Sequence, residues 1–184
     1  MFTLPDTAGT APVIETERLR LRAHWLTDFA DCLALWNEPT VYRYITGKPG
    51  TEGEVWARIL RYIGHWAALG FGYWAVEEKA TGRFIGEVGF GDYKREINPP
   101  LTGMPELGWV MDPARHGQGL GTEAVGAAVA WGDAHFGPRR ICCIAAPENT
   151  ASLRLAAKFS FREVLRTTYL GDPTILFIRE PRNK

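Results

Sequence analysis

Alternating glycines interrupt the chain where a predicted strand runs into a predicted helix. The segment His116-Gly117-Gln118-Gly119-Leu120-Gly121-Thr122 follows the apolar stretch Glu106 to Met111 and opens a long helical pattern. Because glycine has no Cβ atom, its backbone can bend sharply and approach a ligand closely. The first N–H groups of a helix lack partners within the helix, and the helix dipole attracts anions to that end. The segment therefore predicts a binding site for a diphosphate group.

The same glycines have three other interpretations. The segment lacks the Lys-Ser/Thr pair that ends a Walker-type phosphate loop. The strands before it are predicted to be antiparallel, which does not fit a dinucleotide-binding βαβ unit. A tight turn that packs a helix closely against a sheet would use the same glycines without any ligand. The glycines alone leave this structural alternative open.

A second polar group begins the helix that is predicted over residues 149–159. Asn149 suits the N-cap position and Ser152 suits the third position of the helix. Both residues can serve simply as caps. Because the strands on the two sides of the long helix each lead into a helix N-terminus, both termini open at one edge of the sheet. The side chains of Asn149 and Ser152 can therefore also face a ligand in a cleft there.

A carboxylate begins the strand that precedes the glycines. Strand alternation turns Glu106 away from Leu107 and Trp109, toward the face that carries the bare Gly108. A carboxylate at the mouth of a cleft can accept a proton from an ammonium group, directly or through water. It can equally be a solvated residue at the end of a strand. Gly108 also permits a β-bulge, which would splay the neighbouring strand open.

The spacing of apolar and charged residues predicts about seven strands and about four helices. Strands are expected at 17–22, 73–78, 84–93, 106–111, 141–146, 161–170 and 174–179, and helices at 28–37, 54–69, 119–136 and 149–159. Gly171-Asp172-Pro173 is expected to join the last two strands as a hairpin turn. The strands flanking the long helix form a locally parallel pair. The predicted fold class is therefore α/β (α+β), with a mixed, mostly antiparallel sheet flanked by helices.

The composition is that of one ordinary globular domain. We expect a flexible lead-in over residues 1–12 and a single domain over residues 13–184. Lys plus Arg number 21 and Asp plus Glu also number 21. This balance argues against nucleic acid or an anionic membrane as a partner, since either would favour a net positive charge. No apolar run reaches the ~18 residues of a membrane span.

The cysteines and histidines indicate neither a disulfide framework nor a metal site. The three cysteines are odd in number and lack CxxC spacing, which fits small buried side chains in a reducing cytoplasm. His24, His65 and His135 show no clustering that suggests metal ligands. We therefore expect no metal and a cytoplasmic protein.

Four segments together resemble the GNAT superfamily of acyl-CoA-dependent N-acyltransferases. They are Glu15 to Arg22, Glu106 to Trp109, His116 to Ala124, and Asn149 to Phe161. Their order and spacing are most similar to the branch of ribosomal-protein N-terminal acetyltransferases. The resemblance covers most of the chain and implies a GNAT-like sheet that is splayed at its centre.

The resemblance implies an enzyme that binds acetyl-CoA and transfers the acetyl group directly to an amine, without an acetyl-enzyme. The main chain from His116 to Gly121 would hold the pyrophosphate, and the strand end would pair with the pantetheine amides. Glu106 would act as the base through water, and Ser152 would be the donor to the leaving thiolate. The implied cofactor-binding residues are Val110, Met111, Arg115, His116, Gly117, Gln118, Gly119, Leu120, Gly121, Thr122 and Asn149.

Three positions depart from the family pattern. His116 stands where Arg or Gln is usual, Ala156 where many members carry a Tyr proton donor, and Ser160 where Gly often precedes the final Phe. Ser152 therefore replaces the missing acid by default. His116 either contacts a phosphate oxygen or is an exposed loop residue. Arg115 has the same two interpretations, as a phosphate contact or as a solvated surface charge.

The resemblance leaves the acceptor open between a protein or peptide N-terminus and a small-molecule amine. A non-catalytic acyl-CoA-binding or sensing module on the same fold is the alternative function. The missing Tyr gives weight to that module, whereas Glu106 favours an enzyme. Homodimers are common in the family, so the resemblance is compatible with a homodimer.

Overall fold

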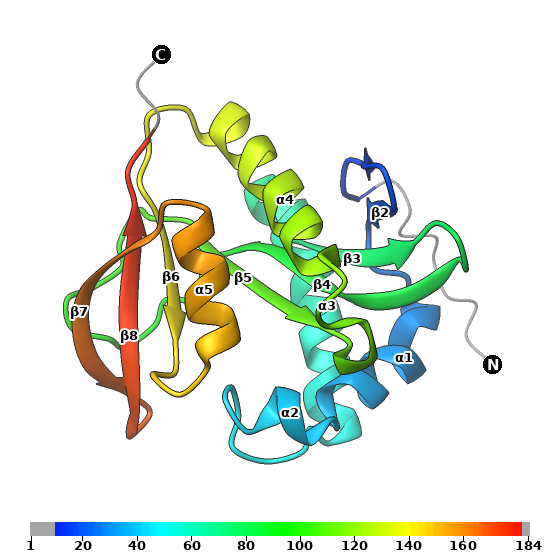
Figure 1. Ribbon diagram of the computed structural model, residues 1–184, viewed down its shortest axis with the longest axis horizontal. Helices are drawn as coiled ribbons and strands as arrows, with labels where there is room; N and C mark the ends of the chain where they lie inside the picture. Colours follow the sequence, from blue (N-terminus) through cyan, green and yellow to red (C-terminus); the bar gives the residue numbers. More distant parts are fainter. Residues whose placement is uncertain (1–9, 182–184) are drawn as a thin grey trace.

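An open sheet of eight strands runs through the protein, and the computed structural model describes residues 10–181 (Figure 1). The strands are β1 (Ile14–Glu15), β2 (Leu19–Arg22), β3 (Tyr73–Glu78), β4 (Arg83–Gly91), β5 (Glu106–Met111), β6 (Ile141–Ala145), β7 (Arg162–Tyr169) and β8 (Asp172–Arg179). They lie in the order β1-β2-β3-β4-β5-β6-β8-β7. Among the strands described, neighbours are antiparallel except for the parallel pair β5 and β6. The expected fold class is therefore confirmed, with a sheet of eight strands rather than about seven.

Helices cover both faces of this sheet. They are α1 (Phe29–Trp36), α2 (Pro39–Tyr42), α3 (Glu52–Leu69), α4 (Leu120–Phe136) and α5 (Thr150–Lys158), with short 3₁₀ turns η1 (Leu26–Asp28) and η2 (Pro113–Arg115). Figure 1 shows α4 crossing one face, with α3 behind the sheet on the other. No helix among residues 10–181 is both long and apolar enough to cross a membrane.

Strand β5 divides the core into two parts because its side chains alternate between the two faces. Leu107 and Met111 belong to the cluster that packs against α4. Val110 belongs to a second cluster with Cys32 of α1 and Ile59 of α3. The predicted alternation along this strand is therefore confirmed, and Glu106 lies on the α1 and α3 side.

The boundaries of α3 follow from its end residues. Thr51 accepts a hydrogen bond from the Glu54 backbone N–H at 3.2 Å, and the Glu54 carboxylate accepts one from the Thr51 N–H at 2.9 Å. This reciprocal cap lets the helix begin at Glu52, two residues before the predicted start. Gly70 ends it with a φ of 72°, a left-handed conformation that glycine adopts readily.

The sheet is splayed between β5 and β6, as expected, but a bulge at Gly108 is not the cause. The two strands share one residue pair, Glu106 with Cys142. The β4–β5 ladder is regular over six pairs, so Gly108 carries no bulge. The register shift of the central strands lies instead between Val76 and Glu77 of β3. The prediction that a bulge at Gly108 opens the sheet is therefore wrong.

The final hairpin also differs from expectation. Tyr169 pairs with Asp172, so the turn consists of Leu170 and Gly171, with φ values of 52° and 92°. Two consecutive positive φ values match the twist of a tight hairpin, and Asp172 is thereby already in β8.

Of the expected lead-in over 1–12, residues 1–9 lie outside the described part. Ala11 is buried, and the Trp74 indole donates a 2.8 Å hydrogen bond to the Pro12 carbonyl.

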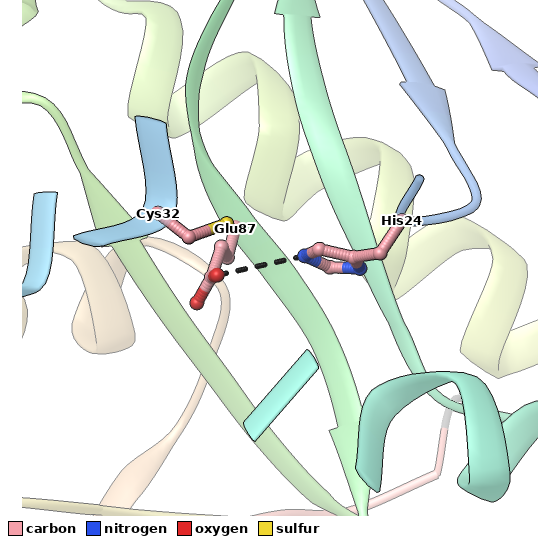
Figure 2. Close-up of side chains that lie close together, drawn as sticks. All are labelled: His24, Cys32 and Glu87. Atoms are coloured by element: carbon pink, nitrogen blue, oxygen red, sulfur yellow. Dashed lines mark ion pairs between the residues drawn. The ribbon is translucent and has the colours of Figure 1, made fainter. Parts of the chain in front are cut away.

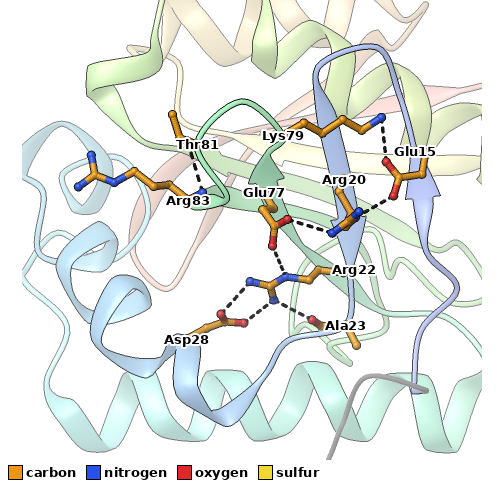
Figure 3. Close-up of polar contacts among 9 residues, drawn as sticks. All are labelled: Glu15, Arg20, Arg22, Ala23, Asp28, Glu77, Lys79, Thr81 and Arg83. Atoms are coloured by element: carbon orange, nitrogen blue, oxygen red, sulfur yellow. Dashed lines mark hydrogen bonds and ion pairs between the residues drawn. The ribbon is translucent and has the colours of Figure 1, made fainter.

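A buried ion network joins β2, β3 and the start of α1 (Figure 3). The Arg22 guanidinium binds both oxygens of Asp28, at 2.8 and 2.9 Å, and Glu77 at 2.9 Å. All three side chains are buried. Asp28 is the N-cap residue of α1, but its carboxylate forms no cap hydrogen bond there; it pairs with Arg22 and accepts the Trp25 N–H. The alternation of charged and apolar residues along β2 therefore includes a cation, Arg22, that is buried inside the protein.

Removing Arg22 should destabilise the fold strongly. In Arg22→Met the carboxylates of Asp28 and Glu77 lose their buried partner, which should cost about 3–5 kcal/mol of unfolding free energy. Urea denaturation measures this change. Arg20→Met is the matched control, because Arg20 also contacts Glu77 but is 47% exposed, and its loss should cost at most about 1 kcal/mol. Equal losses in the two variants would contradict the role given to burial.

Candidate active site

A cleft of about 580 Å³ opens where β5 ends and where α4 and α5 begin. Its lining includes ten of the residues predicted from the sequence: Val110, Met111, Arg115, His116, Gly117, Gly119, Gly121, Thr122, Asn149 and Ser152. Three predicted residues do not line it: Glu106, Gln118 and Leu120. The fold therefore brings the β5 end, the glycine segment and the start of α5 to one place, although they are far apart in the sequence.

Two of the three glycines are required by the backbone conformation. Gly117 has a φ of 77° and Gly119, the N-cap of α4, has a φ of 80°. Both values lie in the left-handed region, where a side chain is strained. Gly121 lies inside the helix, and a Cβ atom there would meet Met111 at 3.5 Å, an ordinary contact. The first two glycines shape the loop, whereas the third lines the cleft beside β5 without needing a glycine conformation.

The loop presents a row of unpaired main-chain donors. Within residues 10–181, no backbone or side-chain acceptor meets the N–H groups of residues 117–122, and the first helical bond of α4 runs from Glu123 N–H to the Gly119 carbonyl. Unpaired N–H groups at a helix N-terminus attract anions, because their partial positive charges add to the helix dipole. This geometry suits a diphosphate group.

Cations supplement these donors. Arg115, Arg154 and Lys158 line the cleft, and no Asp or Glu is found among its lining residues in the described chain. Arg115 also forms an ion pair of 3.0 Å with Glu78. Sequence reasoning missed Arg154 and Lys158, although their spacing from Ala151 places all three on one helical face. The cleft is therefore positively charged within a chain of zero net charge.

Arg18, which sequence reasoning also missed, braces the loop from behind. Its guanidinium donates to the Gln118 carbonyl at 2.9 Å and to Glu123 at 2.7 Å. Glu123 also accepts the Arg18 N–H at 2.7 Å and the Thr16 hydroxyl at 2.6 Å. Burial alone would raise the pKa of Glu123, but these hydrogen bonds and the charge of Arg18 lower it. The segment before β2 thus fixes the first turn of α4.

Some predicted contacts can involve only the main chain. The His116 ring lies with Nε2 3.1 Å from the Met111 carbonyl, so it is turned back toward β5. The Gln118 side chain donates to the Ala114 carbonyl at 3.2 Å, and Leu120 is buried in the core. Gln118 and Leu120 contribute unpaired backbone N–H groups to the loop, whereas the His116 N–H donates to the Pro113 carbonyl at 3.1 Å. The side chains of all three residues hold the shape of the loop.

Asn149 caps α5 and also lies at the cleft. Its side-chain oxygen accepts the Ser152 N–H at 3.1 Å, which caps α5, and it also lines the cleft together with Ser152. Ala156, where a Tyr would be usual in the family, is buried in the core. Ser152 belongs to α5 and lines the cleft.

Glu106 lies outside the cleft, on the same strand and the same face as Val110. It is buried, and Arg95 donates to both carboxylate oxygens, at 2.6 and 2.7 Å. The Arg95 guanidinium lies 4.7 Å from the Tyr93 ring centre and 4.8 Å from that of Tyr169. Sequence reasoning did not find this partner, because Arg95 belongs to a segment that was predicted as a polar loop.

Gly108 provides room for a tyrosine beside Glu106. A Cβ atom on Gly108 would lie 1.9 Å from the Tyr73 hydroxyl oxygen, so the hydroxyl occupies the space that a side chain would need. Burial raises the pKa of Tyr73, and burial also raises the pKa of Tyr93 to about 12. Both phenols therefore remain protonated near neutral pH and can act as hydrogen-bond donors on this face of β5.

This fold and cleft define an acyltransferase that uses acetyl-CoA. Residues 18–162 match the acetyltransferase (GNAT) domain family. An uncharacterised N-acetyltransferase of Bacillus licheniformis, p20, is 28% identical over 149 residues, which cover 80% of this chain and 81% of that protein. The chain belongs to the GNAT acetyltransferase family, as the sequence resemblance predicted.

Solved structures agree with this assignment. A protein described as a GNAT-family acetyltransferase from Bordetella pertussis has a TM-score of 0.81 and 28% identity, covering 91% of this chain and 99% of that one. RimL, a ribosomal L7/L12 α-N-protein acetyltransferase solved in complex with coenzyme A, has a TM-score of 0.74 and 16% identity, covering 92% and 98%. At 16% identity, the similarity to RimL shows a common fold.

The loop geometry predicts a sharp effect of a side chain at Gly119. Gly119→Val places a β-branched residue at a φ of 80° beside the unpaired N–H groups, so coenzyme A affinity should fall at least about tenfold. Isothermal titration calorimetry measures it. Gly121→Ala, which adds a methyl group where space exists, should retain the affinity. Unchanged binding by a folded Gly119→Val protein would refute the loop as the diphosphate site.

The ionised Glu123 carboxylate should make the free energy of unfolding depend on pH in the acidic range. Its pKa in the folded protein is below its ordinary value of 4.5, so its stabilising contribution is complete above about pH 4.5 and disappears as the pH falls through the folded value. Glu123→Gln should therefore be less stable than the wild type at pH 7, with a smaller difference at pH 3.5. Denaturation at both pH values measures this. A difference that grows in acid would contradict the assignment.

Proposed function

We propose that this enzyme transfers an acetyl group from acetyl-CoA directly to a primary amine. The observation that carries the proposal is the row of unpaired N–H groups at residues 117–122. The row follows β5, whose edge toward β6 is open beyond the single pair of Glu106 with Cys142. A diphosphate at the row and an extended amide chain along β5 account for both features. These are the two parts of coenzyme A that precede its thioester.

The fit extends along the cleft. Arg115, Arg154 and Lys158 supply positive charge for phosphate groups. Val110 and Met111 offer the main chain of β5 to the pantetheine amides, and Asn149 faces the same arm from α5. A pantetheine arm in this position directs the thioester along β5 toward the point where β5 and β6 meet. Glu106 lies at that point, on one face of the sheet.

The chemical step needs one proton acceptor and one donor. The amine nitrogen attacks the thioester carbonyl carbon, the new C–N bond forms, and the C–S bond breaks. The proton lost by the amine passes through water to Glu106, and the Ser152 hydroxyl donates a hydrogen bond to the leaving thiolate. The thiolate then takes a proton from solvent, so the products are an acetylated amine and coenzyme A.

The pairing with Arg95 is compatible with this role for Glu106. A carboxylate has about four lone-pair sites, and a bidentate guanidinium occupies two of them. The remaining sites can accept a proton from water. Arg95 thus holds the carboxylate in one orientation while the acceptor amine approaches. Because Tyr73 and Tyr93 stay protonated, they do not compete with Glu106 as bases.

We infer that the acceptor is a protein or peptide N-terminus or a small-molecule amine, and that the enzyme works in the cytoplasm. The similarity in fold to RimL supports an N-terminal amine. All three cysteines are free and buried, which fits a reducing compartment. Acetylation of a panel of peptides and small amines, followed by mass spectrometry, selects between the acceptors. Coenzyme A binding without transfer to any of them would favour a non-catalytic acyl-CoA-binding module.

Replacing Glu106 should separate catalysis from binding. Glu106→Gln should lower kcat by about 100-fold or more, because the proton acceptor is lost, while coenzyme A affinity stays close to that of the wild type. Steady-state kinetics across pH, together with calorimetry, measure both. Arg95→Met is the control that breaks the same ion pair but keeps the carboxylate. Because Arg95 orients the carboxylate, Arg95→Met should lower kcat as well, but less than Glu106→Gln does. If a folded Glu106→Gln protein matches the wild type across pH, Glu106 is not the base.

A further inference from the structure

Three side chains of kinds that bind transition metals meet inside the protein, apart from the cofactor cleft (Figure 2). His24 follows β2, Cys32 lies on α1 and Glu87 lies on β4. One donor atom from each lies within 4.8 Å of the others. All three residues are at most 1% exposed. Their separation in the sequence hid this group, because only the folded sheet and α1 bring the three together.

The spacing of the donors suits a zinc ion. Because no two donors are more than 4.8 Å apart, a point exists within about 2.8 Å of all three, compared with zinc–ligand distances of about 2.0–2.3 Å. His24 Nε2 and Glu87 Oε1 are already 3.5 Å apart, close to the edge of a zinc-centred tetrahedron, about 3.3–3.4 Å. An inward shift of at most about 0.8 Å per donor completes the coordination.

Neighbouring groups orient the carboxylate for such a role. The Trp36 indole N–H and the Tyr62 hydroxyl both donate to Glu87 Oε2, each at 3.2 Å. The other oxygen, Oε1, is the one that faces His24 (Figure 2). Carboxylates that bind metals are commonly held by hydrogen bonds from surrounding side chains. The arrangement around Glu87 therefore matches that of a metal ligand with its supporting shell.

The charges also balance. A thiolate from Cys32 and the Glu87 carboxylate together neutralise a divalent cation, and a neutral His24 imidazole adds none. A neutral group is the form that a buried site favours, since an uncompensated charge there is costly. Thiolate and imidazole ligands favour zinc over magnesium or calcium, which prefer oxygen ligands.

We propose that His24, Cys32 and Glu87 form a structural zinc site. The ion would fasten α1 and the turn after β2 to the centre of the sheet. Glu87 pairs with Val110 on the neighbouring strand, so the site stiffens the strand end that borders the cofactor cleft. A water molecule or the Tyr62 hydroxyl completes the fourth position.

Metal analysis of tag-free protein tests the site directly. After purification from zinc-supplemented medium and gel filtration without chelator, mass spectrometry should find about one zinc per chain. Protein refolded without metal should have a lower melting temperature, which added zinc restores. Cobalt-substituted protein should show a thiolate-to-cobalt absorption band in the near ultraviolet.

Variants then assign the ligands. Cys32→Ala and Glu87→Gln should lose the zinc and the response of the melting temperature to zinc. Cys143→Ala is the matched control, because Cys143 is an equally buried thiol outside the cluster, and it should keep both. Coenzyme A affinity, measured in parallel, reports separately on the proposed function. Wild-type protein that refolds fully, holds no zinc and melts at the same temperature with and without it would overturn the proposal.

Discussion

The cleft at the end of β5 depends on β5 losing its parallel neighbour after a single residue pair. Glu106 is bridged to Cys142, and in the described chain β6 is paired beyond that point with β8 alone. On its other edge, β5 remains fully paired with β4. One side of the strand is therefore held rigidly, while the other offers main-chain groups that need a partner. A ligand with its own amides satisfies this need better than a purely hydrophobic one.

The charge around the cleft differs from the net charge of the chain. The 21 basic and 21 acidic residues cancel in total, but their placement differs. Two acidic residues near the cleft form ion pairs with arginines: Glu123 with Arg18, and Glu78 with Arg115. Arg154 and Lys158 line the cleft together with the loop that carries the unpaired main-chain N–H groups. Such an arrangement cannot be seen in composition, because it depends on which side of each helix faces the cleft.

The sequence predicted best what local pattern determines. The limits of β3 and β5 were predicted to the residue, and the glycine segment was placed correctly at the start of α4. What it missed depends on contacts between distant segments, which no spacing rule encodes. The ion pair of Arg95 with Glu106 and the buried group around Glu87 are of this kind. The hairpin turn was misplaced because Leu170 takes a positive φ that its residue type disfavours.

The Arg18 brace has a consequence for transplanting this site. Arg18 reaches across 100 positions of sequence to hold the Gln118 carbonyl, and it reaches Glu123 on the next turn as well. A peptide graft carrying only the glycine segment and α4 into another scaffold would leave its main support behind. The smallest portable unit of the proposed anion site therefore includes the segment just before β2, so the loop depends on two distant parts of the chain rather than on one contiguous motif.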